Sequence, residues 1–93
     1  MPFKLRIGGH AFEFVRADKV VDDDGEVVDG LIHWDKSLVE ISKGSKSMEE
    51  QAIIHEILHL VDYVYNADKL NEDSTERLAQ GLYQVMCDKG WIG

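Results

Sequence analysis

The segment from Ser47 to about Asn66 or Ala67 constrains the fold most, because it predicts a long helix that is apolar around much of its circumference. Ser47 and Glu50 have the S-x-x-E spacing of a capping box, which is typical of a helix start. Apolar side chains then recur at helical spacing and form a wide stripe of Ile53, Ile54, Ile57, Leu58, Leu60, Val61 and Val64. A helix with so wide an apolar surface is expected at the centre of the core.

The residues before this helix have the alternating pattern of half-buried strands. Phe3, Leu5 and Ile7 alternate with charged residues, and Gly8 and Gly9 then give a hairpin signal. We expect strands over residues 3–7, 12–16, 27–34 and 38–42. The first half therefore predicts a small antiparallel sheet of three to four strands.

The residues after the long helix predict a second helix, from Asp73 to about Lys89. Asp73 and Glu76 have the spacing of a second capping box, and Gly90 is suited to end the helix. Its expected buried stripe consists of Leu78, Leu82, Val85 and Met86. A small N-terminal sheet followed by two packed helices is an α+β fold, and we expect it to form one domain over residues 1–93.

Composition and charge exclude several classes of function. The chain has 18 acidic and 10 basic residues and a net charge of −8, which argues against nucleic acid as a partner. Cys87 is the only cysteine, so no intrachain disulfide can form. The N-terminus lacks the apolar region of a secretion signal, and no stretch has the roughly 18 apolar residues of a membrane span. We therefore expect a cytoplasmic protein with no membrane partner.

His55, Glu56 and His59 form the pattern H-E-x-x-H within the long helix. Positions four apart lie on the same helical face, so both imidazoles can bind one metal ion. An unpaired Glu56 would be costly inside the apolar stripe, and a divalent cation offsets that cost. The pattern is typical of zinc hydrolases, in which two histidines bind Zn²⁺ and the glutamate is the general base towards a zinc-bound water. We predict metal ligands at His55 and His59 and a catalytic role for Glu56.

The third metal ligand decides the class of zinc enzyme. Metzincins use a glycine and a histidine where this chain has Asp62 and Tyr65, so that class is excluded. Peptide deformylase uses an upstream cysteine, which is absent here. Gluzincins use a glutamate from the following helix, which here is Glu76 or, one turn earlier, Glu72. We favour Glu76, and Glu72 stays open because the linker must run back along the first helix to bring Glu76 near His59.

The chain resembles the minigluzincins and, more loosely, the metallopeptidases associated with phages and mobile elements. The matching pieces are I-I-H-E-I-L-H-L-V at 53–61 and E-R-L-A-Q-G-L at 76–82. The resemblance implies a zincin-like fold and a zinc-dependent peptidase with ligands His55, His59 and Glu76. One departure is Gln80, which stands where thermolysin-type enzymes have an aspartate, four residues after the ligand glutamate, that orients a zinc-bound histidine.

The resemblance also implies how this peptidase is used. An edge strand within Leu38–Ser42 is expected to hold an extended peptide by β-augmentation. Some minigluzincins are latent because their own C-terminal segment blocks the cleft. The tail Lys89–Gly93 could act in this way, or Trp91 could instead cap the small core.

These observations predict a zinc-dependent metalloendopeptidase of the gluzincin type that acts on a peptide or protein substrate, in an active or a latent form. The alternative is a non-catalytic module of a phage or mobile element in which zinc staples the fold and the protein binds or regulates a partner. An oxyanion-stabilising residue is left unassigned among Tyr63, Tyr65, Tyr83 and His33.

Overall fold

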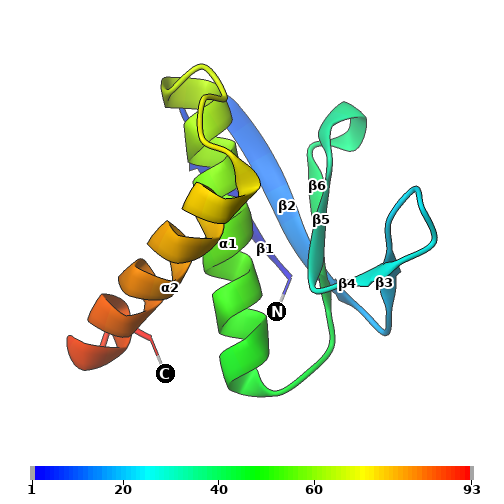
Figure 1. Cartoon of the computed structure of the whole chain (residues 1–93). Helices are drawn as coiled ribbons and strands as arrows, with labels where there is room; N and C mark the ends of the chain where they lie inside the picture. Colours follow the sequence, from blue (N-terminus) through cyan, green and yellow to red (C-terminus); the bar gives the residue numbers. More distant parts are fainter. Residues whose placement is uncertain (1, 93) are drawn as a thin grey trace.

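A four-stranded sheet packs against a long helix, and a second helix crosses that helix on its other side (Figure 1). The computed structural model describes residues 2–92. The helices are α1 (Lys46–Tyr65) and α2 (Glu72–Asp88). The remaining elements are β1 (Phe3–Ile7), β2 (His10–Ala17), β3 (Val20–Val21), β4 (Val27–Val28), β5 (Gly30–His33), the short 3-10 helix η1 (Trp34–Lys36) and β6 (Leu38–Ser42).

The α+β fold class predicted from the sequence is confirmed, with one difference inside the sheet. The strand order is β1-β2-β6-β5, and the outer pairs β1–β2 and β5–β6 are antiparallel as expected. The central pair is parallel, with Phe14 opposite Val39, so the sheet is mixed. Parallel neighbours need a long crossover, and the segment between β2 and β6 supplies it through β3, β4, β5 and η1.

The edge strand beside the long helix is β5 and not the strand at Leu38–Ser42. β6 lies between β2 and β5 and is hydrogen-bonded on both sides, so the prediction of an edge strand there is wrong. The segment expected as one strand over 27–34 is divided into β4, which pairs with β3, and β5, which pairs with β6. This division leaves one side of β5 without a strand partner among the described residues.

The core lies between the sheet and α1. Phe14, Val39 and Ile41 of the sheet are fully buried, and Leu60 of α1 packs against the same cluster. The central place predicted for the long helix is therefore confirmed. Its start differs from the prediction: Ser45 is the N-cap and accepts a hydrogen bond from the Met48 backbone N–H at 3.2 Å.

The apolar stripe predicted to be buried on α2 is largely exposed. Leu78 and Leu82 are 51% and 40% exposed, and Val85 is also exposed, while Met86 is half-buried. The buried positions of α2 are the small residues Thr75 and Ala79. Small side chains let α2 lie close to α1, and Figure 1 shows α2 in front of α1 with β1 and β2 behind it. Because α1 separates α2 from these strands, the larger apolar residues of α2 have little to pack against.

No helix within residues 2–92 is both long enough and apolar enough to cross a membrane.

Candidate metal centre

The two histidines of the H-E-x-x-H pattern lie together on one face of α1. Their ring centroids are 4.7 Å apart, and the two Nε2 atoms are separated by 3.1 Å. Both side chains are mostly buried, with 15% of His55 and 22% of His59 exposed. The helical spacing therefore produces the convergence of ring nitrogens that the sequence predicts.

Glu72, the first residue of α2, brings a carboxylate to this pair of nitrogens. One carboxylate oxygen lies 2.8 Å from His55 Nε2, and the other lies 3.1 Å from His59 Nε2. The ligand atoms of the three residues all lie within 4.8 Å of one another. Two imidazoles and a carboxylate form a donor set that suits Zn²⁺ and leaves a fourth position for water or substrate. The three residues could therefore hold a metal ion, with both histidines mostly buried and Glu72 exposed.

The linker between the helices explains how Glu72 reaches the histidines. The carboxylate of Asp62, which is buried, accepts hydrogen bonds from the Leu70 backbone N–H at 3.2 Å and from the Asn66 side chain at 2.8 Å. Ala67 and Asp68 have positive φ angles of 55° and 57°, which turn the chain back at the end of α1. The buried carboxylate of Asp62 therefore holds the linker where it turns back from the end of α1 towards the start of α2.

The start of α2 also differs from the predicted capping box. Asn71 is the N-cap, and its side chain accepts a hydrogen bond from the Ser74 backbone N–H at 2.7 Å. Asp73 is already within the first turn and pairs with Arg77 at 3.0 Å. The helix begins early enough to place Glu72, and not Glu76, in its first position.

Glu76 contacts His55 at the ring nitrogen that faces away from Glu72. Its Oε2 lies 2.9 Å from His55 Nδ1, and its Oε1 accepts a hydrogen bond from Gln80 at 3.1 Å. An N–H at Nδ1 that donates to Glu76 leaves the lone pair of Nε2 directed at the cluster. Of the two glutamates kept open by the sequence, Glu72 therefore lies among the three clustered donors, whereas Glu76 is in position to orient His55.

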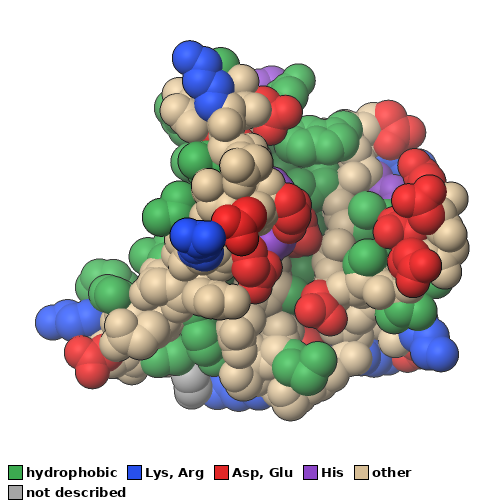
Figure 2. Space-filling view, viewed as in Figure 1, with side chains coloured by type: hydrophobic (Ala, Val, Ile, Leu, Met, Phe, Trp, Pro, Cys, Tyr) green, Lys and Arg blue, Asp and Glu red, His purple; other side chains and the backbone are tan. Residues whose placement is uncertain are grey.

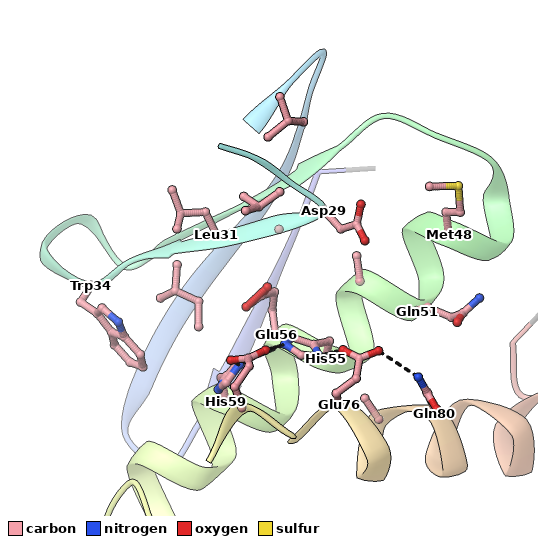
Figure 3. A pocket seen from close by; sticks show the side chains of 17 residues that line it. Asp29, Leu31, Trp34, Met48, Gln51, His55, Glu56, His59, Glu76 and Gln80 are labelled. Carbon is pink, nitrogen blue, oxygen red and sulfur yellow. Dashed lines mark hydrogen bonds and ion pairs between the residues drawn. The ribbon is translucent and has the colours of Figure 1, made fainter. Parts of the chain in front are cut away.

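Glu56 is a buried carboxylate beside this cluster. Its side chain points from α1 towards β5 (Figure 3), and the residue is only 7% exposed. Burial raises the pKa of Glu56 to about 7, His55 opposes this shift, and the charges of Glu72 and Asp29 add to it. A carboxyl group with a pKa near neutrality can both accept and return a proton at physiological pH.

Gly30 of β5 makes room for Glu56, and nothing in the sequence indicated this role. A β-carbon placed on Gly30 would lie 2.7 Å from Glu56 Oε2 and 3.0 Å from its Cγ. The φ angle of Gly30 is not positive, so backbone conformation does not require glycine there. A larger residue there would displace the Glu56 carboxylate, so the close approach of β5 favours glycine.

A groove of about 720 Å³ contains the cluster and is bordered by α1, α2 and β5. Figure 2 shows acidic side chains gathered beside the histidines, at the edge of a hollow between α2 and the strands. In Figure 3, Trp34 lies at the His59 end of the groove, and Met48 and Gln51 lie at the other end. Gly30, Leu31 and Ile32 of the β5 edge strand line the groove along its length.

The C-terminal tail does not line this groove within the described residues. Trp91 is 66% exposed and belongs neither to the groove nor to the core cluster, so it does not cap the core. Gly90 has a φ of 74° and ends α2, as its sequence position predicts. Gly93, the last residue of the predicted blocking segment, lies outside the described residues.

The four candidates for oxyanion stabilisation do not line the groove either. Tyr83 donates a hydrogen bond to Glu50 at 2.9 Å, and the His33 ring lies 2.6 Å from Glu40. Tyr65 is largely exposed, and the Tyr63 ring contacts Trp34 in a tilted arrangement at the end of the groove. None of these side chains is therefore assigned that role.

Comparisons of the chain with protein-family models, with curated proteins and with solved structures gave no match.

Proposed function

We propose that this protein is a zinc-dependent metallopeptidase of the gluzincin type. The observation that carries the proposal is the buried Glu56 carboxylate beside a cluster of two histidines and a glutamate that opens into a groove. A site that only stabilises a fold closes all its ligand positions with protein groups and has no use for a buried base. The alternative is a non-catalytic regulatory module in which zinc only stabilises the fold. It does not account for the burial of the Glu56 carboxylate beside the cluster.

We propose His55, His59 and Glu72 as the zinc ligands and Glu76 as the residue that orients His55. The support is the contact of Glu72 with both Nε2 atoms and of Glu76 with Nδ1. With Glu72 as ligand, Glu76 stands four residues later, at the position where thermolysin-type enzymes have their orienting aspartate. The departure at Gln80 is then replaced by a smaller one, a glutamate in place of the aspartate.

Glu56 has the properties of the acid and base in peptide hydrolysis. Bound Zn²⁺ would supply a Lewis acid at this site. Glu56 would take a proton from the attacking water and give it to the departing amine. Its burial and the close contact with Gly30 restrict the carboxylate to one place beside the histidines. The two histidines are mostly buried, whereas Glu72 is 72% exposed, so the cluster is open to water and substrate on the side of α2.

The substrate that fits the groove best is an extended peptide. β5 offers backbone groups on its unpaired side, and residues of the same strand line the groove. A peptide that adds to this edge gains main-chain hydrogen bonds irrespective of its sequence. We further propose a cytoplasmic setting without a nucleic-acid partner, on the basis of the single cysteine and the net charge of −8.

The test compares cleavage of an unfolded protein by the zinc-loaded wild type, Glu56→Gln and Glu72→Ala. We expect the wild type to cut, Glu56→Gln to retain zinc but lose cleavage by at least about 100-fold, and Glu72→Ala to lose both. A Glu56→Gln protein as active as the wild type would contradict the proposal. A zinc-loaded wild type that cuts no peptide, also after removal of residues 90–93, would favour the regulatory module.

A further inference from the structure

Two exposed aromatic side chains stand at one end of the groove, beyond the metal cluster. Tyr63 follows His59 by four residues, as His59 follows His55, so the three lie on one face of α1. Trp34 begins η1, directly after β5. The two rings contact each other at a tilt of 44° with centroids 4.6 Å apart, and Trp34 is 47% exposed and Tyr63 is 53% exposed. Aromatic surface is therefore open to solvent at this end of the groove.

The aromatic pair borders a second hollow that is apolar at its base. This hollow has a volume of about 180 Å³, and Trp34 is a wall that it shares with the main groove. Its base is the buried ring of Phe12, which meets Trp34 edge-on at 6.4 Å. Its remaining lining residues are His10, Ser37, Tyr63 and Val64.

The chemistry of this hollow differs from that of the main groove. The main groove contains the carboxylates of Asp29, Glu56, Glu72 and Glu76, whereas the lining of the hollow includes no acidic residue. The chain has a net charge of −8, yet the lining of this hollow has no acidic side chain to bind a cation. We therefore expect the hollow to bind apolar side chains of a ligand in preference to charged ones. Stacking on an aromatic face adds to the burial of apolar area when the ligand is itself aromatic.

The turn that carries Trp34 is held in place by the sheet. Ser37 has a positive φ of 50°, and its carbonyl accepts a hydrogen bond from the Glu13 backbone N–H of β2 at 2.9 Å. The side chains of Phe12 and Tyr63 hold the indole from two sides. The hollow is therefore preformed, which reduces the entropy lost when a ligand binds.

The distance from the cluster indicates which part of a peptide reaches the hollow. One helical turn separates His59 from Tyr63, or about 6 Å along the axis of α1. An extended peptide advances about 3.3 Å per residue, so this distance corresponds to about two residues. Side chains two apart also point to the same side of a strand.

We propose that Trp34 and Tyr63 form a specificity subsite for an aromatic or large aliphatic side chain of the substrate, about two residues from the scissile bond. This inference rests on the proposed function, because it takes the groove to bind an extended peptide. It narrows the substrate class to chains with an exposed bulky apolar residue, as in unfolded or unstructured proteins.

The test measures binding of fluorescein-labelled peptides to zinc-loaded Glu56→Gln protein by fluorescence polarisation, so that it does not depend on cleavage. One peptide consists of Ala, Ser and Gly, and a second has one Phe in the same sequence. We expect the Phe peptide to bind about tenfold more tightly, an effect that corresponds to 1.4 kcal/mol. Adding Trp34→Ala or Tyr63→Ala should reduce this preference to less than about twofold.

Tyr65→Ala is the matched control, because Tyr65 is an exposed tyrosine of α1 that lines neither the main groove nor the hollow. It should leave the preference for Phe unchanged. A preference that survives in both Trp34→Ala and Tyr63→Ala proteins with wild-type circular dichroism would overturn the proposal, and so would equal binding of the two peptides. If the Phe preference depends on Trp34 but the zinc-loaded wild type cuts neither peptide, the subsite stands and the peptidase proposal fails.

Discussion

At the scale of single residues, the two ring nitrogens of His55 distinguish the roles of two glutamates. Nε2 faces Glu72 and His59, and Nδ1 faces Glu76. The sequence predicted His55, Glu56 and His59 because their convergence depends only on helical spacing, which is local. The sequence favoured Glu76 over Glu72 as the third ligand, whereas the clustered donors include Glu72. The choice depends on where the linker ends and α2 begins, which no local pattern decides. Gly30 was missed because its role is a contact between β5 and α1, distant in the chain.

Gly30 gives the first prediction, which concerns the position of Glu56. Gly30→Ala places a methyl group against the carboxylate and should displace it. A displacement of about 1 Å costs roughly 100-fold in rate, so kcat should fall strongly while zinc content stays at the wild-type level. Gly9→Ala is the control, since a β-carbon there meets nothing within 4 Å. Equal kcat values for Gly30→Ala and Gly9→Ala would refute the role assigned to this contact.

Glu56 gives a second prediction, for the stability of metal-free protein. The pKa of Glu56 is about 7 in the folded state against 4.5 for an ordinary glutamate, so between these values the native state keeps a proton that the unfolded state loses. Stability from this group is therefore complete below pH 4.5 and is lost as the pH rises towards 7. The loss amounts to about 3 kcal/mol, because each pKa unit corresponds to about 1.4 kcal/mol.

Urea unfolding in EDTA measures this effect when the wild type is compared with Glu56→Gln, which carries no titrating group at that position. The variant should be more stable than the wild type at pH 8, and the difference should be small at pH 5. A difference that does not change with pH would show that Glu56 titrates normally in the folded protein.

At the scale of elements, Asp62 connects the end of α1 to the start of α2. Its carboxylate holds the Leu70 N–H, two residues before Glu72. Asp62→Ala leaves that N–H without its partner and frees the linker, so zinc affinity should fall roughly 10- to 100-fold. Competition with a chelator of known affinity measures this change. Asp73→Ala removes the same charge from the exposed side of α2 and should leave zinc affinity unchanged, and equal affinities for the two variants would count against the role of Asp62.

The two helices and the strands β1, β2 and β6 were predictable, whereas β3, the division of 27–34 into β4 and β5, and the strand order were not. Period-two and helical patterns identify strands and helices because they depend on near neighbours. The parallel pairing of β2 with β6 and the edge position of β5 depend on the path of residues 18–37, which no local pattern encodes. Both helix starts were placed two residues late, because Ser45 and Asn71 are caps that precede equally suitable residues, Ser47 and Asp73.

At the scale of the whole molecule, stability comes from the layer between the sheet and α1. Leu60 is fully buried in this layer, whereas Leu82 of α2 is 40% exposed. Leu60→Ala should therefore lower the free energy of unfolding by about 3 kcal/mol and Leu82→Ala by less than about 1 kcal/mol. Chemical denaturation of both variants checks this ratio. Similar losses for the two variants would mean that the exposed stripe of α2 is buried in solution.

The candidate site takes its side chains from both helices. The sheet and α1 supply the histidines, Glu56 and the edge strand, while α2 supplies the two glutamates. Net negative charge around the groove means that a divalent cation relieves repulsion among carboxylates as it binds. Zinc should accordingly join α2 to the rest of the fold.

The metal centre is tested by the zinc content per chain of the wild type, Glu72→Ala and Glu76→Ala after dialysis, measured by mass spectrometry of the metal. We expect about one zinc ion per chain in the wild type and almost none in Glu72→Ala. Glu76→Ala should retain zinc with an affinity weakened roughly tenfold or more, as an orienting residue requires. Full zinc in Glu72→Ala with none in Glu76→Ala would exchange the two roles, and a wild type that binds no zinc would contradict the metal centre itself.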